Sequence, residues 1–400
     1  MSSISRPSVS DIFLVFLRLG CTSFGGPVAH IGYFREEFVS RRRWLDEQTY
    51  ADLVALGQFL PGPASSQVGF ALGVLRGNGL AGGVAAWLAF TMPSALILLA
   101  FGLAASALTG PLAEAVVHGL KLVAVAIVAH AIWGMAKSLT PDRQRMAIAL
   151  AAVAIALFVG GSFGQVAAIA IGALAGLWLC SADPGPSAER LRFPVSRRQG
   201  ATALALCAGL FILSPLAFQS TGNHALGLFD AFYRAGGLVF GGGHVVLPLL
   251  QAEVVGPGWV GREIFIAGYG AAQAMPGPLF TIASYLGMMM GGSVGAGLYG
   301  ALLVTVAIFL PAGLLMWGAL PFWSSLRAHP KAQSVLMGVN AAVVGLLLAA
   351  LYDPVFTTAV TGARDLAAAL VCYAALQFWK APPWAVVVLA GLVGAVLYSL

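Results

Sequence analysis

Two Pro-Gly-Pro segments constrain the fold of this chain more than any other feature of its sequence. The first, Pro61-Gly62-Pro63, interrupts an apolar, helix-like stretch that runs from Tyr50 to Leu75. Proline lacks a backbone N–H, and the residue before a proline is pushed away from the helical conformation. We therefore expect one helix to end before this segment and another to begin at Pro63, because proline is a favourable first helical residue.

The restarted helix is expected to accept an anion at its first turn. Its leading N–H groups have no acceptor within the helix, and the hydroxyl groups of Ser65 and Ser66 follow directly. The same arrangement returns as Pro276-Gly277-Pro278, followed by Thr281. A single break is often a packing kink, whereas broken helices at corresponding places in two halves are typical of a transporter's binding site. The two segments therefore predict the substrate site.

The composition indicates whether these helices belong to a soluble protein or to a membrane protein. Charged residues make up 9% of the chain and hydrophobic residues 59%, whereas ordinary soluble domains carry about 25% charge. We therefore expect an all-α polytopic membrane protein. The net charge of +6 is interpreted as a sign of membrane topology rather than of nucleic-acid binding. The four cysteines have no CxxC spacing, and we expect no disulfide, metal or cofactor.

The chain contains the same unit twice. Arg18 and Arg234 are separated by almost the same length of chain as the two Pro-Gly-Pro segments. A single connecting span at 201–219 would invert the second unit, which predicts inverted repeats with re-entrant or broken helices around a cavity. The expected divisions are a first repeat at 1–180, a basic cytoplasmic linker plus one connecting span at 181–222, and a second repeat at 223–400.

Basic residues set the expected orientation. The arginines at 41–43 and at 190–198 fall on one side if residues 11–27 and the broken pair at 50–75 enter and leave the membrane as re-entrant hairpins. Lysine and arginine accumulate in cytoplasmic loops, so we expect the N-terminus and the linker in the cytoplasm. A full crossing by residues 11–27 would instead place the arginines at 41–43 outside.

Charged residues in or near the apolar segments are candidates for handling the anion or its coupling ion. Arg18 and Arg234 occupy equivalent positions in the two repeats, and the competing interpretation is an arginine that extends to the membrane surface. Glu37 and Glu253 are equivalent acids, interpreted either as proton-coupling carboxylates or as structural residues. The equivalence across the repeats is what favours a functional role for these four residues.

Further candidates carry weaker signals. Lys121 has no charged counterpart in the second repeat, and it either lines the anion path or pairs with Glu114. The glycines after Phe24 and Phe240 either allow close helix contact or touch the ligand. The residues assigned to substrate binding are Gly25, Gly26, Gln58, Pro61, Gly62, Pro63, Ser65, Ser66, Gly241, Gly242, Gln273, Pro276, Gly277, Pro278 and Thr281.

The motifs around the two breaks form a specific set. They are Phe24-Gly25-Gly26-Pro27-Val28-Ala29-His30, Trp44-Leu45, Gln58-Phe59-Leu60-Pro61-Gly62-Pro63, Phe240-Gly241-Gly242-Gly243-His244 and Gln273-Ala274-Met275-Pro276-Gly277-Pro278. These motifs resemble the chromate transporter family of bacteria and archaea, in its two-domain form and over nearly the whole chain. The resemblance implies efflux of chromate across the inner membrane, with sulfate as the related oxyanion and with dependence on membrane energy.

We interpret the chain as a secondary active transporter, not an enzyme, that exports chromate and sulfate-like oxyanions across the bacterial inner membrane. The alternatives are an oxyanion channel and an uptake transporter for sulfate or another small anion. A membrane-embedded enzyme, such as a chromate reductase or a lipid transferase, has no supporting haem, flavin, metal or nucleotide motif. The expected partners are the oxyanion and the lipid bilayer. Nucleic acid is not expected, and a homodimer is left open.

Overall fold

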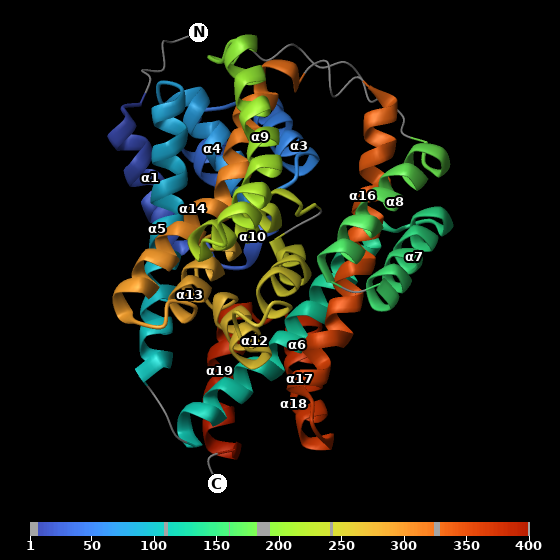
Figure 1. The fold of residues 1–400 in the computed structure, drawn as a ribbon. Helices are drawn as coiled ribbons and strands as arrows, with labels where there is room; N and C mark the ends of the chain where they lie inside the picture. Colours follow the sequence, from blue (N-terminus) through green and yellow to red (C-terminus); the bar gives the residue numbers. More distant parts are fainter. Residues whose placement is uncertain are drawn as a thin grey trace.

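The computed structural model describes residues 7–107, 111–159, 161–181, 193–240, 243–323 and 329–398. Every secondary-structure element within these ranges is a helix, which confirms the all-α prediction (Figure 1). The first repeat comprises α1 (Val9–Thr22), α2 (Gly26–Arg35), η1 (Glu36–Arg41), α3 (Glu47–Phe59), α4 (Ala64–Arg76), α5 (Leu80–Ala107), α6 (Pro111–Leu139), α7 (Arg143–Val159) and α8 (Gly161–Leu179).

The connecting span is α9 (Arg197–Thr221), and the second repeat follows it. Its elements are α10 (His224–Gly237), η2 (Gly243–Val245), α11 (Val246–Leu250), η3 (Gln251–Val255), α12 (Arg262–Ala272), η4 (Leu279–Thr281), α13 (Ile282–Met289), α14 (Val294–Ala319), η5 (Leu320–Phe322), α16 (Pro330–Ala350), η6 (Leu351–Phe356), α17 (Thr357–Ala359), α18 (Ala363–Gln377) and α19 (Pro383–Tyr398).

Polar side chains fix where several of these helices begin. Ser8 and Asp11 form a capping box at the start of α1, and Ser196 and Gln199 form another at the start of α9. Asp46 caps α3 by accepting a hydrogen bond from the backbone N–H of Thr49. This bond holds the pKa of the Asp46 carboxyl below its ordinary value. The caps therefore fix the residues at which α1, α3 and α9 begin.

Both Pro-Gly-Pro segments break their helices, as the sequence predicts. α3 ends at Phe59 and α4 begins at Ala64, so Pro63 is the capping residue and not the first helical one. In the second repeat, α12 ends at Ala272 and helical structure resumes at Leu279. α3 and α4 have 13 residues each, which corresponds to about 20 Å of helix. Neither helix crosses a hydrocarbon core of about 30 Å alone.

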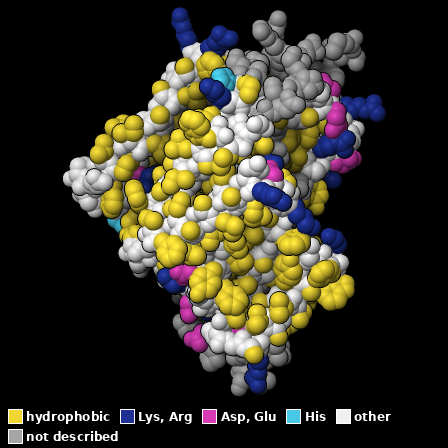
Figure 2. Space-filling model, turned by 90° about the vertical axis from the view of Figure 1, so that its right-hand side faces the viewer, with side chains coloured by type: hydrophobic (Ala, Val, Ile, Leu, Met, Phe, Trp, Pro, Cys, Tyr) yellow, Lys and Arg dark blue, Asp and Glu magenta, His cyan; other side chains and the backbone are white. Residues whose placement is uncertain are grey.

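Within the described ranges, five helices are long and apolar enough to cross a membrane: α5, α6, α9, the helix from α14 into η5, and the helix from α16 into α17. Large apolar side chains also face outward on the shorter helices, among them Phe158, Phe163 and Trp178 on α7 and α8. Figure 2 shows hydrophobic side chains over most of the visible face. The chain is therefore a multi-pass membrane protein.

The two repeats are inverted and interwoven (Figure 1). α3 and α4 lie toward the end of the molecule that carries the N-terminus, whereas α12 lies toward the end that carries the C-terminus. α6 of the first repeat packs along α18 and α19 of the second, and α16 of the second packs along α7 and α8 of the first. Each repeat therefore completes its packing with helices of the other repeat. The division of the chain into a first repeat at 1–180, a linker with a connecting span, and a second repeat at 223–400 stays a prediction.

Candidate functional site

The two helix breaks interlock through reciprocal backbone hydrogen bonds. The Gly62 N–H donates to the carbonyl oxygen of Val239 (2.6 Å), and the Gly277 N–H donates to the carbonyl oxygen of Ser23 (2.8 Å). Ser23 and Val239 are the residues directly before the two Phe-Gly-Gly segments. Each break therefore crosses the glycine-rich segment of the other repeat, and the same contact is made twice in opposite senses.

Both contacts require glycine. Gly62 has φ +125° and Gly277 has φ +89°, which lie in the region that L side chains rarely adopt. A Cβ on Gly62 would lie 2.8 Å from the Cβ of Ala312, and one on Gly277 would lie 3.1 Å from the carbonyl oxygen of Phe90. The N–H groups of both glycines already have acceptors, so in this conformation an anion has to use the N–H groups that follow.

The first break leads into a cavity of about 610 Å³ between α4, α5, α9 and α14. Pro63 supplies no side-chain cap to α4. Ser66 and Gln67 line the cavity, although they are only 4% and 1% exposed, and the Ser66 Oγ and Gln67 Oε1 have no hydrogen-bond partner among the described residues. The Gln67 side chain is fixed because its Nε2–H donates to the Pro61 carbonyl (2.8 Å). The start of α4 thus combines a helix end that has no side-chain cap with the unpaired hydroxyl of Ser66 and the unpaired amide oxygen of Gln67.

The second break has similar backbone geometry but different side chains. The Thr281 hydroxyl donates to the Pro278 carbonyl oxygen (2.6 Å), so its hydrogen is already used. Apolar Phe280 and Ile282 flank it, where Ser65 and Gln67 flank Ser66 in the first repeat. The helical turn after Pro278 is a three-residue η4 followed by α13. Polar groups that face a cavity are therefore found at the first break.

A histidine that the sequence analysis did not select connects the two breaks. His30 on α2 is 1% exposed. Its Nδ1 lies 3.2 Å from the Oγ of Ser65, and its Nε2 lies 3.1 Å from the Ser23 carbonyl oxygen that also accepts the Gly277 N–H. The one sequence feature that could have identified His30 as a functional residue was its position at the end of the first Phe-Gly-Gly motif. A lone histidine in an apolar run has no periodic pattern that marks it.

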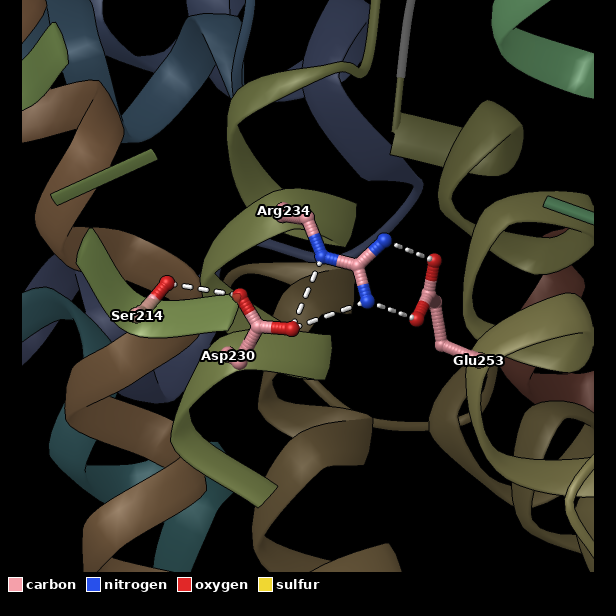
Figure 3. Close-up of polar contacts among 4 residues, drawn as sticks. All are labelled: Ser214, Asp230, Arg234 and Glu253. Atoms are coloured by element: carbon pink, nitrogen blue, oxygen red, sulfur yellow. Dashed lines mark hydrogen bonds and ion pairs between the residues drawn. The ribbon is translucent and has the colours of Figure 1, made fainter. Parts of the chain in front are cut away.

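Arg234 is neutralised inside the protein (Figure 3). Its Nε donates to Asp230 (3.0 Å), and its Nη1 and Nη2 donate to the two carboxylate oxygens of Glu253 (3.0 and 2.7 Å). The Ser214 hydroxyl of α9 donates to the other oxygen of Asp230 (2.6 Å). Both carboxylates are mostly buried, so this arginine balances internal charge rather than facing an open path.

Arg18 does not share this environment, although the sequence places it at the equivalent position. Arg18 is exposed on α1, and the residue one turn before it is Leu14, where the second repeat has Asp230. Glu37 instead accepts from Arg41 (2.7 Å) and Arg42 (2.6 Å). The physical reason is α9, which packs against α10 and holds Asp230 beside Arg234 through Ser214, while 30% of the Arg234 side chain stays exposed. Equivalence in sequence therefore does not give these two arginines the same surroundings.

The remaining candidates are dispersed. Lys121 is buried on α6 and lies 3.7 Å from Glu263 of α12, which is an ion pair across the repeats that differs from the expected partner Glu114. Gln58 is exposed and Gln273 is half-buried. Gly25 and Gly26 have positive φ values of 98° and 77° at the start of α2. The predictions for Gly241 and Gly242 lie outside the described residues. Pro276 and Pro278 are buried on either side of Gly277.

No metal site emerges from this arrangement. Within the part of the chain that the structure describes, no three His, Cys, Asp or Glu side chains are grouped as metal ligands. The donors at the first break are the Ser66 hydroxyl and the leading backbone N–H groups of α4, whereas the unpaired Oε1 of Gln67 is an acceptor. Hydroxyl and backbone N–H donors recognise anions by hydrogen bonding.

Comparison with known proteins agrees with the repeat and the break motifs. The family model for the chromate transporter matches residues 10–177 and again residues 226–395. A chromate transport protein of Pseudomonas aeruginosa is 30% identical over 98% of this chain and 93% of its own length. A chromate transport protein of Cupriavidus metallidurans is 28% identical over 98% of this chain and 94% of its own length. No solved structure is significantly similar. The chain belongs to the chromate transporter family, whose named members are transporters and not enzymes.

Proposed function

We propose that this protein exports chromate and related tetrahedral oxyanions across the bacterial inner membrane, with energy drawn from the membrane gradient. The relatives named chromate transport proteins support the substrate class. The observation that carries the proposal is the uncapped start of α4, where the buried Ser66 and Gln67 side chains line a cavity between membrane-spanning helices.

The chemistry at this point suits a tetrahedral dianion. The leading N–H groups of α4 and the Ser66 hydroxyl offer hydrogen bonds, and the helix dipole contributes partial positive charge at the same end. Arg198 at the start of α9 also lines the cavity and supplies a full positive charge. In a medium of low dielectric constant these contributions are much stronger than they are in water.

The functional test compares Ser66→Ala with its counterpart Thr281→Val. We expect Ser66→Ala to weaken the apparent affinity for chromate several-fold, because it removes an unpaired hydroxyl at the site. Thr281→Val should leave affinity unchanged, since that hydroxyl is already bonded to Pro278. The measurement is uptake of labelled chromate and sulfate into inverted vesicles, as a function of concentration and normalised to inserted protein.

A protonophore distinguishes the proposed transporter from its alternatives. Export by the cell corresponds to uptake by inverted vesicles, and it should saturate with concentration and stop when the gradient is dissipated. Flux that does not saturate and persists without a gradient would indicate a channel. Equal affinity loss in Ser66→Ala and Thr281→Val would contradict the assignment of the site to the first break.

The orientation is tested by cysteine labelling. We propose that the N-terminus and the loop after η1 are cytoplasmic, because the arginines at 41–43 gather there. In a cysteine-free background, Ser40→Cys should resist an impermeant thiol reagent in intact cells and react in inverted vesicles. Pro257→Cys, in the loop between η3 and α12 of the inverted repeat, should show the opposite pattern. Labelling of Ser40→Cys from outside would contradict the proposed cytoplasmic placement of this loop.

A further inference from the structure

We propose that His30 is a positioning residue that links proton binding to anion binding at the start of α4. This inference rests on the proposed function and adds the group that makes the site respond to pH. His30 acts through the hydroxyl of Ser65, the second residue of α4. The hydroxyl accepts or donates according to the charge of the ring.

The hydrogen bonds fix the proton arrangement of the neutral ring. The Ser23 carbonyl oxygen is only an acceptor, so the Nε2 of His30, 3.1 Å away, must carry a hydrogen. In a neutral imidazole the other nitrogen then has a lone pair. The Ser65 hydroxyl, 3.2 Å from this Nδ1, must therefore donate its only hydrogen to the ring. In this state the Ser65 Oγ presents lone pairs to its surroundings, which disfavours an anion.

Protonation reverses the bond between His30 and Ser65. A proton taken from solvent binds Nδ1, which then donates to the Ser65 Oγ, while Nε2–H continues to donate to Ser23. The Ser65 hydroxyl hydrogen is released and becomes available to an anion at the helix start. The ring also gains a positive charge. Both changes favour a bound anion, and a bound anion in turn favours the charged ring. No covalent bond other than N–H is formed.

The hydrogen-bond and ring partners of His30 among the described residues carry no charge. The groups in contact with the ring are Ser23, Ser65 and the Phe90 ring, whose centroid lies 5.3 Å away. α5, which carries Phe90, has no ionisable side chain. The ionisable groups on α2 and on the elements near it are Asp11, Arg18 and Cys21 on α1, Tyr33 and Arg35 on α2, Glu36, Glu37 and Arg41 on η1, Glu47, Tyr50 and Asp52 on α3, and Arg76 on α4.

Several of these groups are already engaged elsewhere. Arg35 pairs with Glu47, and Arg41 pairs with Glu37. The Tyr50 hydroxyl donates to the Ile31 carbonyl oxygen. The ion pairs of Arg35 and Arg41 and the hydrogen bond of Tyr50 are made to partners other than His30. An anion at the start of α4 is the charge to which the imidazolium is proposed to respond.

The same carbonyl extends the link to the other repeat. Ser23 accepts from both His30 and Gly277, so the ring, the first break and the second break share one hydrogen-bonded chain. An added charge on His30 strengthens its own bond to this carbonyl, because charge-assisted hydrogen bonds are shorter and stronger than neutral ones. The protonation state of His30 is thus coupled both to the start of α4 and to the crossing at Gly277.

The test is His30→Gln, which reproduces the neutral ring and cannot be protonated. Its amide can donate to Ser23 and accept from Ser65. Chromate and sulfate binding to purified protein in lipid nanodiscs is measured from acid to alkaline pH, and the ratio of the two proteins' affinities is taken at each pH. This ratio cancels the ionisation of the ligand itself. The wild-type advantage should reach about tenfold or more at acid pH and disappear as the pH rises.

Two controls separate the switch from a structural role. His224→Gln changes an exposed histidine at the start of α10 and should keep the wild-type pH profile. Ser65→Ala keeps the His30 ring but removes the hydroxyl, and it should lower affinity at acid pH more than at alkaline pH. In weakly buffered solution, wild-type protein should take up a proton on binding sulfate, and His30→Gln should not.

The outcomes are distinguishable. A constant affinity ratio between wild type and His30→Gln across the pH range would overturn the inference while leaving oxyanion binding intact. Proton uptake by His30→Gln equal to that of the wild type would also overturn it. Should His30→Gln not insert, an equal loss of affinity at every pH in Ser65→Ala would overturn it. Absence of chromate and sulfate binding to the wild type would overturn the proposed function, and this inference with it.

Discussion

Gly62→Ala and Gly277→Ala are each expected to abolish transport, because both glycines lie at the crossings of the two repeats. Alanine at a positive φ costs about 1–2 kcal/mol. The new methyl group also collides with Ala312 at the first crossing and is tightly crowded by Ser94 and the Phe90 carbonyl at the second. These penalties together are a large part of the typical folding stability of about 5–15 kcal/mol. Transport and thermal denaturation in detergent should both be affected.

A compensating substitution identifies the cause of this loss. Ala312→Gly removes the atom that lies closest to the new methyl group of Gly62→Ala, but it does not relieve the φ penalty. The double variant should therefore regain part of its stability and transport. Gly209→Ala on α9 is the matched control, because its methyl group meets no atom within 4 Å. Wild-type transport by Gly62→Ala would contradict the interlocked arrangement of the breaks.

Arg234→Gln is expected to destabilise the protein by about 3–5 kcal/mol, because it leaves a buried carboxylate without its positive partner. Asp230 is 3% exposed, and Glu253 would also lose its bidentate arginine. Arg18→Gln is the matched control in the other repeat. Its change in stability should stay within about 0.5 kcal/mol, since Arg18 is exposed and the neighbouring Leu14 is 62% exposed.

The double variant Arg234→Gln/Glu253→Gln tests the pair directly. Removing both partners also removes the uncompensated charge of Glu253, so the combined loss should be smaller than the sum of the single losses. Denaturation in detergent, followed for all four proteins, gives the coupling. Similar stability losses in Arg18→Gln and Arg234→Gln would contradict the different environments described for them.

The sequence was sufficient for the features that depend on local chemistry. Proline and glycine restrict backbone conformation wherever they occur, so the breaks at Gly62 and Gly277 were predictable, as were the repeat and the membrane-spanning helices. The partners of these glycines were not predictable. The bond from Gly62 to Val239 joins residues that are far apart in the chain, and no periodicity indicates it.

Charged residues were harder to interpret for the same reason. Arg18 and Arg234 look equivalent because the repeat aligns them, yet Ser214 and α9 give only Arg234 its enclosed carboxylate network. Lys121 was expected to pair with Glu114 if it did not line the anion path, and it lies near Glu263 of the other repeat instead. A sequence pattern reports the neighbours along a helix, whereas the surroundings of a buried charge come from whichever helix packs on it.

The interwoven helices have a consequence for synthesis of the chain. α6 leaves the ribosome well before α18 and α19, against which it packs in the finished protein. At about 5–20 residues per second, the surface of α6 waits on the order of 10–50 s for its partners. During that interval the first repeat sits in the membrane with its contact surface bare, accessible to lipid, to the insertion machinery or to a neighbouring nascent chain. Assembly of the two repeats is therefore a late event that requires nearly the whole chain.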